Sequence, residues 1–272
     1  MANPIVRDTA EFHFLPIDRY PVSAGFLSDR GPVRPNNEDS AAVTIPADKA
    51  VLQRKGILVM VADGMGGREG GETASGLAAR HVPSAYYLHN GTADESLLAA
   101  FRQANRAILD EAERNKRLAG MGTTCSAVAV VNGLAFAAHV GDSRIYLVRG
   151  GGAYRMTEDH SAPMQLVNRG IITLAEAAHH EDRNVILRAM GTRPDLEVAR
   201  WREPFPLQPG DRLVLCSDGL HETVSDGEIA QLAAGSPDPQ TACASLIELA
   251  TRRECGDNVT AAVISMGRAI SE

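Results

Sequence analysis

The chain has 272 residues, of which 44% are hydrophobic and 22% are charged. This length allows one or two domains, and this composition excludes a disordered or fibrous protein. The 34 acidic side chains outnumber the 27 basic ones and leave a net charge of −7, so we expect neither a nucleic-acid partner nor binding to an anionic membrane.

From the N-terminus, the pattern predicts strands first and then two long helices. Residues 1–19 carry no strong pattern and are expected to form an N-terminal arm. The predicted strands are residues 20–27, 40–45 and 56–62. The third is an almost continuous apolar run that stops at Asp63-Gly64, as expected of a strand buried on both faces. The predicted helices are residues 69–88 and 94–118, the second with apolar residues at helical spacing.

The most apolar stretch of the chain, residues 125–140, is interrupted by Asn132-Gly133. Because Asn-Gly between apolar runs is a strong hairpin signal, residues 123–140 are predicted to form two paired strands and not a membrane span. A strand at residues 143–149, a glycine turn at residues 150–152 and another short strand are expected to follow.

The last third of the chain begins with a stretch, residues 161–188, that has no strong core face. Such stretches inside compact domains are usually functional, so we predict a flap at about residues 162–187. Strands are then expected at 196–202 and 211–216, helices from Ser225 and from Asp238 to Gly256, and a last strand at 258–266. The pattern predicts one α+β domain, residues 20–268, with packed sheets flanked by helices.

Targeting signals and cysteine motifs are both missing from the sequence. The first residues hold no cationic start followed by an apolar run, which disfavours a secretory signal. The four cysteines lack metal-ligand spacing, so we expect reduced, buried thiols in a cytoplasmic protein. No arginine stands six residues after any of them, which excludes the signature of a cysteine-based phosphatase.

Acidic residues stand at the ends of the predicted strands. They are Glu38, Asp39, Asp63, Asp142, Asp218 and Asp257. A single Asp at a strand end is ordinary turn chemistry, but rigid strands fix the groups at their rims, so the whole set can converge. Gathered carboxylates repel one another unless a cation compensates them, and oxygen donors without a Cys or His pattern select Mg²⁺ or Mn²⁺.

Eight ordered motifs carry a resemblance to a known family. They are Arg34-Pro-Asn-Asn-Glu38-Asp39, Val61-Ala-Asp63-Gly64-Met65-Gly66-Gly67, Met121-Gly-Thr-Thr124, Gly141-Asp142-Ser143-Arg144, Thr157-Glu-Asp-His160-Ser161, Arg188-Ala-Met-Gly191, Cys216-Ser-Asp218-Gly219-Leu220 and Asp257-Asn258-Val-Thr260. This series closely resembles the metal-dependent protein phosphatases of type 2C, in the forms of the compact bacterial branch. The resemblance covers about residues 20–266, nearly the whole chain.

The resemblance implies a four-layer α-β-β-α sandwich, with two antiparallel β-sheets between helical layers and a cluster of Mn²⁺ or Mg²⁺ ions at one end. The implied metal ligands are Glu38, Asp39, Asp63, Gly64, Asp142, Asp218 and Asp257. Asp63 would bridge two ions, one of them also held by the Gly64 carbonyl. Asp218 and Asp257 would ligate the other ion, and Asp142 would share a third, weaker ion with Asp218.

The implied reaction is the hydrolysis of phosphoserine and phosphothreonine, with Arg34, Asp63 and Asp218 as catalytic residues. Two ions roughly 3.5–4 Å apart activate a water for in-line attack on phosphorus. Arg34 matches the residue that binds the substrate phosphate, for which a planar guanidinium is well suited. Met65 stands where eukaryotic members commonly carry a histidine that can protonate the leaving oxygen. Here either a metal-bound water is that acid, or the leaving group departs without strong help.

Two other functions stay open at this point. The same metal centre can hydrolyse small phosphate esters, or the chain can be a catalytically silent regulator that binds phosphoproteins. Silent relatives usually lose metal carboxylates, whereas Asp39, Asp63, Asp218 and Asp257 are all present, which favours an active enzyme. We expect phosphoprotein substrates, a cognate Ser/Thr kinase as partner, no membrane helix and a monomer.

Overall fold

The computed structural model describes residues 15–17, 20–66 and 69–267, so most of the predicted N-terminal arm lies outside the described residues. The strands are β1 (Leu15–Ile17), β2 (Tyr20–Asp29), β3 (Asp39–Thr44), β4 (Ile57–Met65), β5 (Gly122–Thr123), β6 (Cys125–Val131), β7 (Leu134–Val140), β8 (Arg144–Arg149), β9 (Gly152–Arg155), β10 (Ala199–Arg200), β11 (Phe205–Pro206), β12 (Arg212–Cys216) and β13 (Val259–Met266). The α-helices are α1 (Lys49–Lys55), α2 (Gly70–Leu88), α3 (Ala93–Arg114), α4 (Ala162–Asn168), α5 (Leu174–Ala177), α6 (Asp218–His221), α7 (Asp226–Gly235) and α8 (Pro239–Arg252), and Lys116–Leu118 form a 3₁₀-helix.

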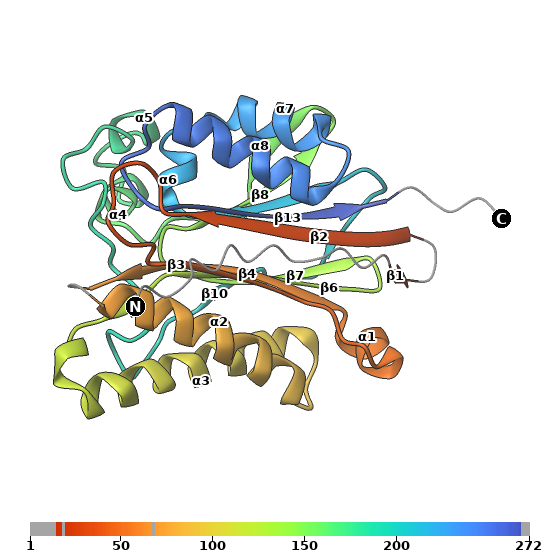
Figure 1. Cartoon of the computed structure of the whole chain (residues 1–272), viewed down its shortest axis with the longest axis horizontal. Helices are drawn as coiled ribbons and strands as arrows, with labels where there is room; N and C mark the ends of the chain where they lie inside the picture. Colours follow the sequence, from red (N-terminus) through yellow and green to blue (C-terminus); the bar gives the residue numbers. More distant parts are fainter. Residues whose placement is uncertain (1–14, 18–19, 67–68, 268–272) are drawn as a thin grey trace.

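Two antiparallel sheets pack face to face at the centre of the molecule (Figure 1). One sheet has the strand order β1-β2-β13-β12-β8-β9. The other has the order β10-β7-β6-β4-β3, with β11 paired to β7 and β5 paired to β4. Helices α7 and α8 cover the outer face of the first sheet, and α2 and α3 cover the outer face of the second. The expected α-β-β-α sandwich is confirmed.

The central strands are buried on both faces, and their side chains alternate between two cores. In β4, Val59 and Val61 belong to the core between the sheets, whereas Met60 and Ala62 belong to the core beneath the helices. None of these four residues has any exposed surface. This double burial explains why the sequence of β4 is continuously apolar instead of alternating with polar residues.

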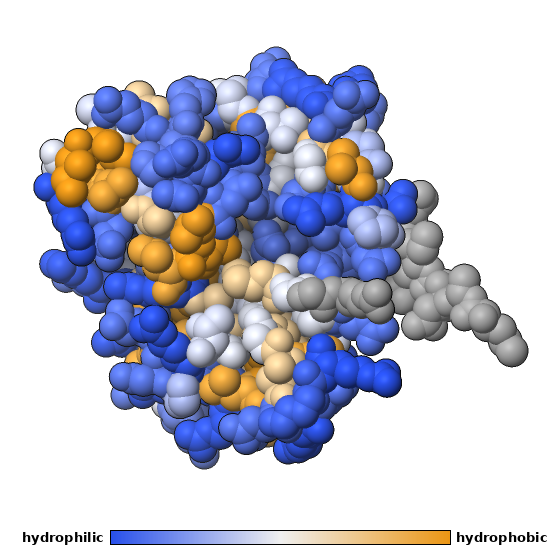
Figure 2. Space-filling view, turned by 90° about the vertical axis from the view of Figure 1, so that its left-hand side faces the viewer, coloured by the Kyte–Doolittle hydropathy of each residue, from blue (hydrophilic) through white to orange (hydrophobic). Residues whose placement is uncertain are grey.

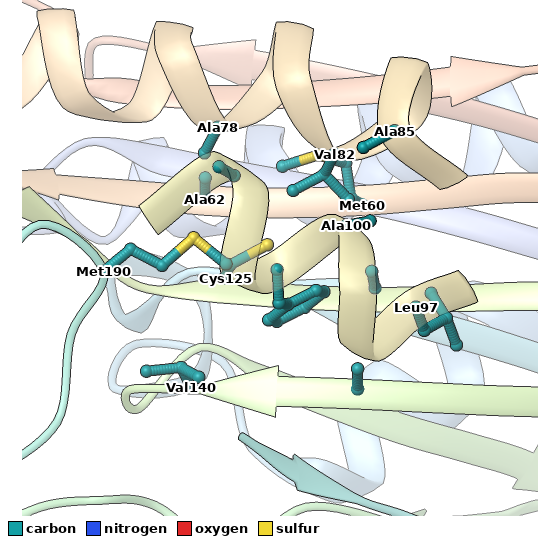
Figure 3. Close-up of a cluster of buried hydrophobic side chains, with 14 of the residues drawn as sticks. Met60, Ala62, Ala78, Val82, Ala85, Leu97, Ala100, Cys125, Val140 and Met190 are labelled. Carbon is teal, nitrogen blue, oxygen red and sulfur yellow. The ribbon is translucent and has the colours of Figure 1, made fainter. Parts of the chain in front are cut away.

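Small side chains line the contact between α2, α3 and the sheet beneath them. In Figure 3, Ala78 and Ala85 of α2 and Ala100 of α3 lie near Met60 and Ala62 of β4. Methyl groups on both surfaces let the helices pack close to the strands, because protein cores fill their volume like organic crystals. This close packing holds α2 directly against β4.

Several predicted boundaries are wrong. The helix predicted at residues 94–118 ends, as α3, at Arg114. β4 does not stop at Asp63 but continues to Met65, because its last two residues pair with β5 after the pairing with β6 has ended. Helix α8 ends at Arg252 and not at Gly256, since Glu254 takes the left-handed conformation, with φ at 56°, that reverses the chain. The strand predicted at residues 196–202 is only Ala199–Arg200, because only this part pairs with β7.

Helix α1 is missing from the predicted elements, although a local signal marks its start. The Asp48 carboxylate accepts the N–H groups of Ala50 and Val51, the typical contacts of an N-cap. The four cysteines are buried and free, as expected. Among the described residues, no helix is both long and apolar enough to cross a membrane.

Candidate metal centre

At one end of the sandwich, on the left in Figure 1, the layer between the two sheets changes from apolar to polar. Every second residue of a strand points to the same face of its sheet, so the change can be followed along the inward-facing residues of each strand. In β4, Val59 and Val61 are followed on the same face by Asp63, and in β12, Leu213 and Leu215 are followed by Ser217. In the neighbouring strands, the inward-facing apolar residues are likewise continued by polar ones. These are Ser28, Asp39, Thr124, Ser126, Ser143 and Thr260. Polar side chains from both sheets therefore meet at this end.

Strand pairing brings four aspartates to this end as two pairs. Asp39 and Asp63 lie directly opposite each other in β3 and β4. Asp142 comes just before β8 and Asp218 just after its partner β12, at the same end of this strand pair, and the charge of Asp142 raises the pKa of Asp218. Because the two pairs come from different sheets, packing of the sheets assembles the group.

Glu38 and Asp257 reach the same end from loops that Asn258 ties together. The N–H of Glu38 donates to Asn258 Oδ1 at 2.8 Å, which joins the loop before β3 to the start of β13. Asn258 Nδ2 donates to the carbonyls of Arg30 and Asn36, each at 2.8 Å. This buried amide, to which the sequence analysis gave no role, places the two loop carboxylates beside the four strand aspartates.

Buried hydroxyl groups hold the aspartates in place. Ser217 Oγ donates to Asp39 Oδ2 at 2.7 Å, across the layer between the sheets. Thr124 Oγ1 accepts the N–H of Asp63 at 2.9 Å and shares a 2.6 Å hydrogen bond with Ser143 Oγ of the other sheet. Sequence reasoning gave none of these hydroxyls a role in the site. Their alignment with the inward-facing apolar positions of their own strands is the signal that finds them.

The clustered carboxylates resist ionisation when no cation compensates them. Burial raises the pKa of Asp39 to about 6 and that of Asp142 to about 7. Burial first, and then the charges of Asp39 and Asp218, raise the pKa of Asp63 well above its usual range. Burial and the charges of Asp142 and Asp257 do the same to the pKa of Asp218. These carboxylates therefore lie within electrostatic reach of one another.

The donor set fits a hard divalent cation. Asp39 Oδ1, Asp142 Oδ1 and Asp218 Oδ1 are buried and have no hydrogen-bond partner in the part of the chain that the structure describes. Buried polar atoms are almost always paired, so unpartnered carboxylate oxygens gathered at one place indicate a cation site. Within the described ranges, no three acidic, His or Cys side chains already surround one point as a ligand set.

Arg34 lies at the exposed edge of the carboxylate cluster. Its Nη2 donates to Asp257 Oδ2 at 2.5 Å, and both side chains keep a third or more of their surface exposed. An ion pair this accessible to water is weakly held, so other partners compete for it readily. The structure thus places Arg34, to which the resemblance gives the substrate phosphate, beside Asp257.

The histidine nearest to a motif, His160, has a structural role. Its Nδ1 accepts the N–H of Gly141 at 3.0 Å, and its ring stacks on that of His139 with centroids 4.8 Å apart. Burial lowers the pKa of His160 to about 4, so the ring is neutral at pH 7. It supports the loop that carries Asp142. This contact favours a structural role for His160 over a role as the acid that protonates the leaving oxygen.

A cleft lies beside His160, the residue that contacts the loop of Asp142, but none of the six clustered carboxylates lines it. The cleft has a volume of about 490 Å³ and is lined from residues 158–168 and 187–197. Residues 162–187 form α4, α5 and the loops between them next to this cleft. Figure 2 looks onto the end of the sandwich that carries the carboxylates and shows hydrophobic patches within a mainly hydrophilic surface. Ile171 and Leu174 of this segment are both more than 60% exposed, so it presents apolar side chains to solvent.

Comparisons with known proteins agree with this arrangement. The serine/threonine phosphatase stp of Listeria innocua is 37% identical over 214 residues, which cover 77% of this chain and 82% of that protein. The serine/threonine protein phosphatase PstP of Mycobacterium tuberculosis is 38% identical over 240 residues, which cover 87% of this chain but 43% of that protein. This chain thus spans less than half of that relative.

Solved structures of similar proteins have the same fold. The Mycobacterium tuberculosis phosphatase PstP/Ppp matches with a TM-score of 0.80 and 36% identity, over 91% of this chain and 99% of that chain. The catalytic domain of PstP in complex with two manganese ions matches with a TM-score of 0.77 and 35% identity, over 90% and 98%. A family model for protein phosphatase 2C matches residues 36–237. The chain belongs to the protein phosphatase 2C family.

Proposed function

We propose that this chain is a metal-dependent Ser/Thr protein phosphatase whose two Mn²⁺ or Mg²⁺ ions bind at the polar end of the sandwich. The observation that carries the proposal is the meeting of carboxylates from both sheets, three of them with a buried, unpartnered oxygen. The related PstP domain was solved with two manganese ions. The assigned ligands are Glu38, Asp39, Asp63, the Gly64 carbonyl, Asp218 and Asp257, with Asp142 at a third, weaker site.

When bound, the ions lower the pKa of a water towards neutrality and offset charge on the transferring phosphoryl group. The chain contributes fixed positions. Asp63 lies opposite Asp39 in the sheet and feels the charge of Asp218, which supports its assignment as the residue that would contribute to both ions. Ser217 holds the Asp39 carboxylate, and Thr124 holds the main chain at Asp63. Because these supports are buried and rigid, catalysis rests mainly on positioning and electrostatics.

Arg34 binds the substrate phosphate in this proposal. Its guanidinium leaves Asp257 and pairs bidentately with phosphate oxygens, for which its planar fork is suited. In this proposal neither Met65 nor His160 protonates the leaving oxygen, so either a water is that acid or the leaving group departs without strong help. Met65 carries a thioether that cannot donate a proton, and His160 is occupied by the N–H of Gly141.

The proposal extends to the setting of the enzyme. The catalytic domain spans residues 20–268, and residues 162–187 act as a flap beside the site. We assign phosphoproteins as substrates, a cognate Ser/Thr kinase as the partner that phosphorylates them, and a signalling role for a monomer. Free, buried cysteines support a reducing compartment, which we take to be the cytoplasm.

The test compares wild type with Asp218→Asn on a phosphothreonine peptide in Mn²⁺. The wild type is expected to release phosphate, to lose this activity in a chelator and to be insensitive to thiol blockers. Asp218→Asn, which keeps the shape but removes a ligand charge, is expected to lower the rate about 100-fold or more. The control is Asp110→Asn on the exposed surface of α3, which keeps the wild-type rate.

The same assay separates the two alternatives. Hydrolysis of small phosphate esters with no release from phosphopeptides or phosphoproteins would favour a small-molecule hydrolase. Binding of a phosphopeptide with no phosphate release in any divalent metal would favour a silent regulator. Equal activity in wild type and Asp218→Asn would contradict the assigned metal centre.

A further inference from the structure

Three segments meet with almost no space between them at one side of the carboxylate cluster. They are the loop before β3 at Glu38, the end of β4 at Gly64, and the first turn of α2 at Gly71. The Gly64 N–H donates to the Glu38 carbonyl at 3.1 Å, so the first two are also joined by a hydrogen bond. Gly71 itself is buried.

The fit at Gly71 leaves no room for a side chain. A Cβ atom there would lie 2.6 Å from Glu38 Oε2 and 2.8 Å from the Gly64 carbonyl oxygen. Carbon and oxygen do not approach so closely without a bond, so one of the neighbours would have to move. The backbone of Gly71 is helical and does not require glycine. The residue is therefore needed for its small size.

The two oxygen atoms that a Cβ would strike have one property in common. The Glu38 carboxylate and the Gly64 carbonyl are both assigned above as metal ligands, and both lie within 2.8 Å of the same point. The neighbouring glycines of α2 differ. A Cβ at Gly70 would meet only the Met121 side chain and main chain, at 3.2 Å or more, and one at Gly76 would meet only the tip of Arg80, at 3.9 Å.

We propose that Gly71 is a positioning residue of the metal centre, whose missing side chain lets Glu38 Oε2 and the Gly64 carbonyl oxygen converge on one ion. The inference rests on the proposed function. Alanine is the better helix former, so local preference opposes a glycine here. Glycine occurs at position 71 because a side chain there would displace the two donor oxygens.

The test is the variant Gly71→Ala, with Gly76→Ala in the same helix as its matched control. Mn²⁺ affinity is measured by calorimetry on each purified protein, independently of activity. Gly71→Ala is expected to weaken the binding of one Mn²⁺ ion about tenfold or more, the usual effect of disturbing a group that orients metal ligands. Gly76→Ala is expected to bind Mn²⁺ as wild type does.

A compensating change separates positioning from a general packing defect. Glu38→Asp shortens the obstructed side chain, so the double variant Gly71→Ala/Glu38→Asp is expected to bind Mn²⁺ more tightly than Gly71→Ala alone. The single variant Glu38→Asp, in which Gly71 is kept, should bind Mn²⁺ more weakly than wild type. A merely structural role for Gly71 predicts no such rescue. In activity assays, Gly71→Ala should raise the Mn²⁺ concentration needed for half-maximal rate more than it lowers the rate at saturation.

Each outcome bears on the inference separately from the function. Wild-type Mn²⁺ affinity in Gly71→Ala would overturn the inference while leaving the phosphatase assignment intact. Equal losses in Gly71→Ala and Gly76→Ala would overturn it as well. If Gly71→Ala is destabilised in chelator, Gly71→Ala/Glu38→Ala removes the obstructing carboxylate but leaves the Gly64 carbonyl in place, so it should withstand more urea than Gly71→Ala. A double variant no more stable than Gly71→Ala would refute the proposed contact with Glu38. Absence of phosphatase activity in wild type would instead count against the proposed function.

Discussion

Replacing Asp39 by asparagine is expected to stabilise the metal-free protein and to destabilise the metal-loaded one. Asp39 is 7% exposed, and its Oδ1 has no partner among the described residues. Its Oδ2 accepts a hydrogen bond from Ser217, which an amide oxygen can also accept. The new amide N–H groups would face carboxylates, since Asp63 lies directly opposite on β4. The change therefore removes a charge while keeping shape and partners.

The magnitude follows from the displaced pKa. Burial, partly offset by hydrogen bonds from Ser217 and Thr260, raises the pKa of Asp39 from 3.8 to about 6. About two pKa units correspond to about 3 kcal/mol between the protonation states. Because the folded state holds this proton more tightly than the unfolded chain, metal-free stability falls as pH rises from about 4 to about 6. At pH 8, Asp39→Asn should gain up to about 3 kcal/mol, and almost nothing near pH 4.

Urea unfolding in a chelator measures this difference at pH 8 and near pH 4, with Asp110→Asn as the exposed control. Repeating the pH 8 experiment in Mn²⁺ should reverse the order of the two proteins, because the variant loses a ligand and so gains less from bound metal. A variant less stable than wild type in chelator at pH 8 would refute the view that repulsion within the cluster strains the metal-free fold. The same gain at both pH values would refute an electrostatic cause.

Arg34→Ala should raise the KM for a phosphothreonine peptide about 10- to 100-fold, since a charged hydrogen bond to phosphate is lost. Arg34→Lys should have a KM between those of wild type and Arg34→Ala. Equal KM values for the three proteins in steady-state kinetics would contradict the assignment of Arg34. Asp142→Ala should still bind two Mn²⁺ ions in calorimetry but turn over more slowly, and full activity at limiting metal would exclude a role for the third site. Phe101→Ala removes a ring with no exposed surface beneath α3, so it should cost about 3–5 kcal/mol in urea unfolding and leave Mn²⁺ affinity unchanged.

Local patterns predicted most elements because each depends on residues close together in the chain. Asn132-Gly133 joins β6 to β7, and the pairing of Val131 with Leu134 around it is the expected hairpin. Ser225 opens α7 with a capping box, as its sequence indicates. Signals of this kind act across two to four residues, so no knowledge of the rest of the fold is needed to interpret them.

The parts that could not be predicted depend on partners far away in the sequence. β4 continues to Met65 only because Gly122 and Thr123 pair with its last two residues, and nothing within β4 encodes that partner. The proposed ligand residues were named through the resemblance, which implies that they meet. Ser217 was missed because it acts on a side chain from a remote segment. Contacts of that kind exist only once the chain has folded.

The position of the centre nevertheless follows a rule that a sequence can carry. In antiparallel sheets, one end of the sandwich receives the starts of some strands and the ends of their neighbours. The polar residue that replaces the inward apolar series therefore comes first in β3, at Asp39, and near the end of β4, at Asp63. In the other sheet, the corresponding polar residues are Ser217, just after the end of β12, and Thr260, near the start of β13. The N–H of Thr260 donates a hydrogen bond to Ser217 Oγ. A sequence in which inward-facing polar residues occur at the start of one strand and at the end of the next therefore indicates a polar end of the layer between the sheets. Polar residues of ordinary turns do not follow this order.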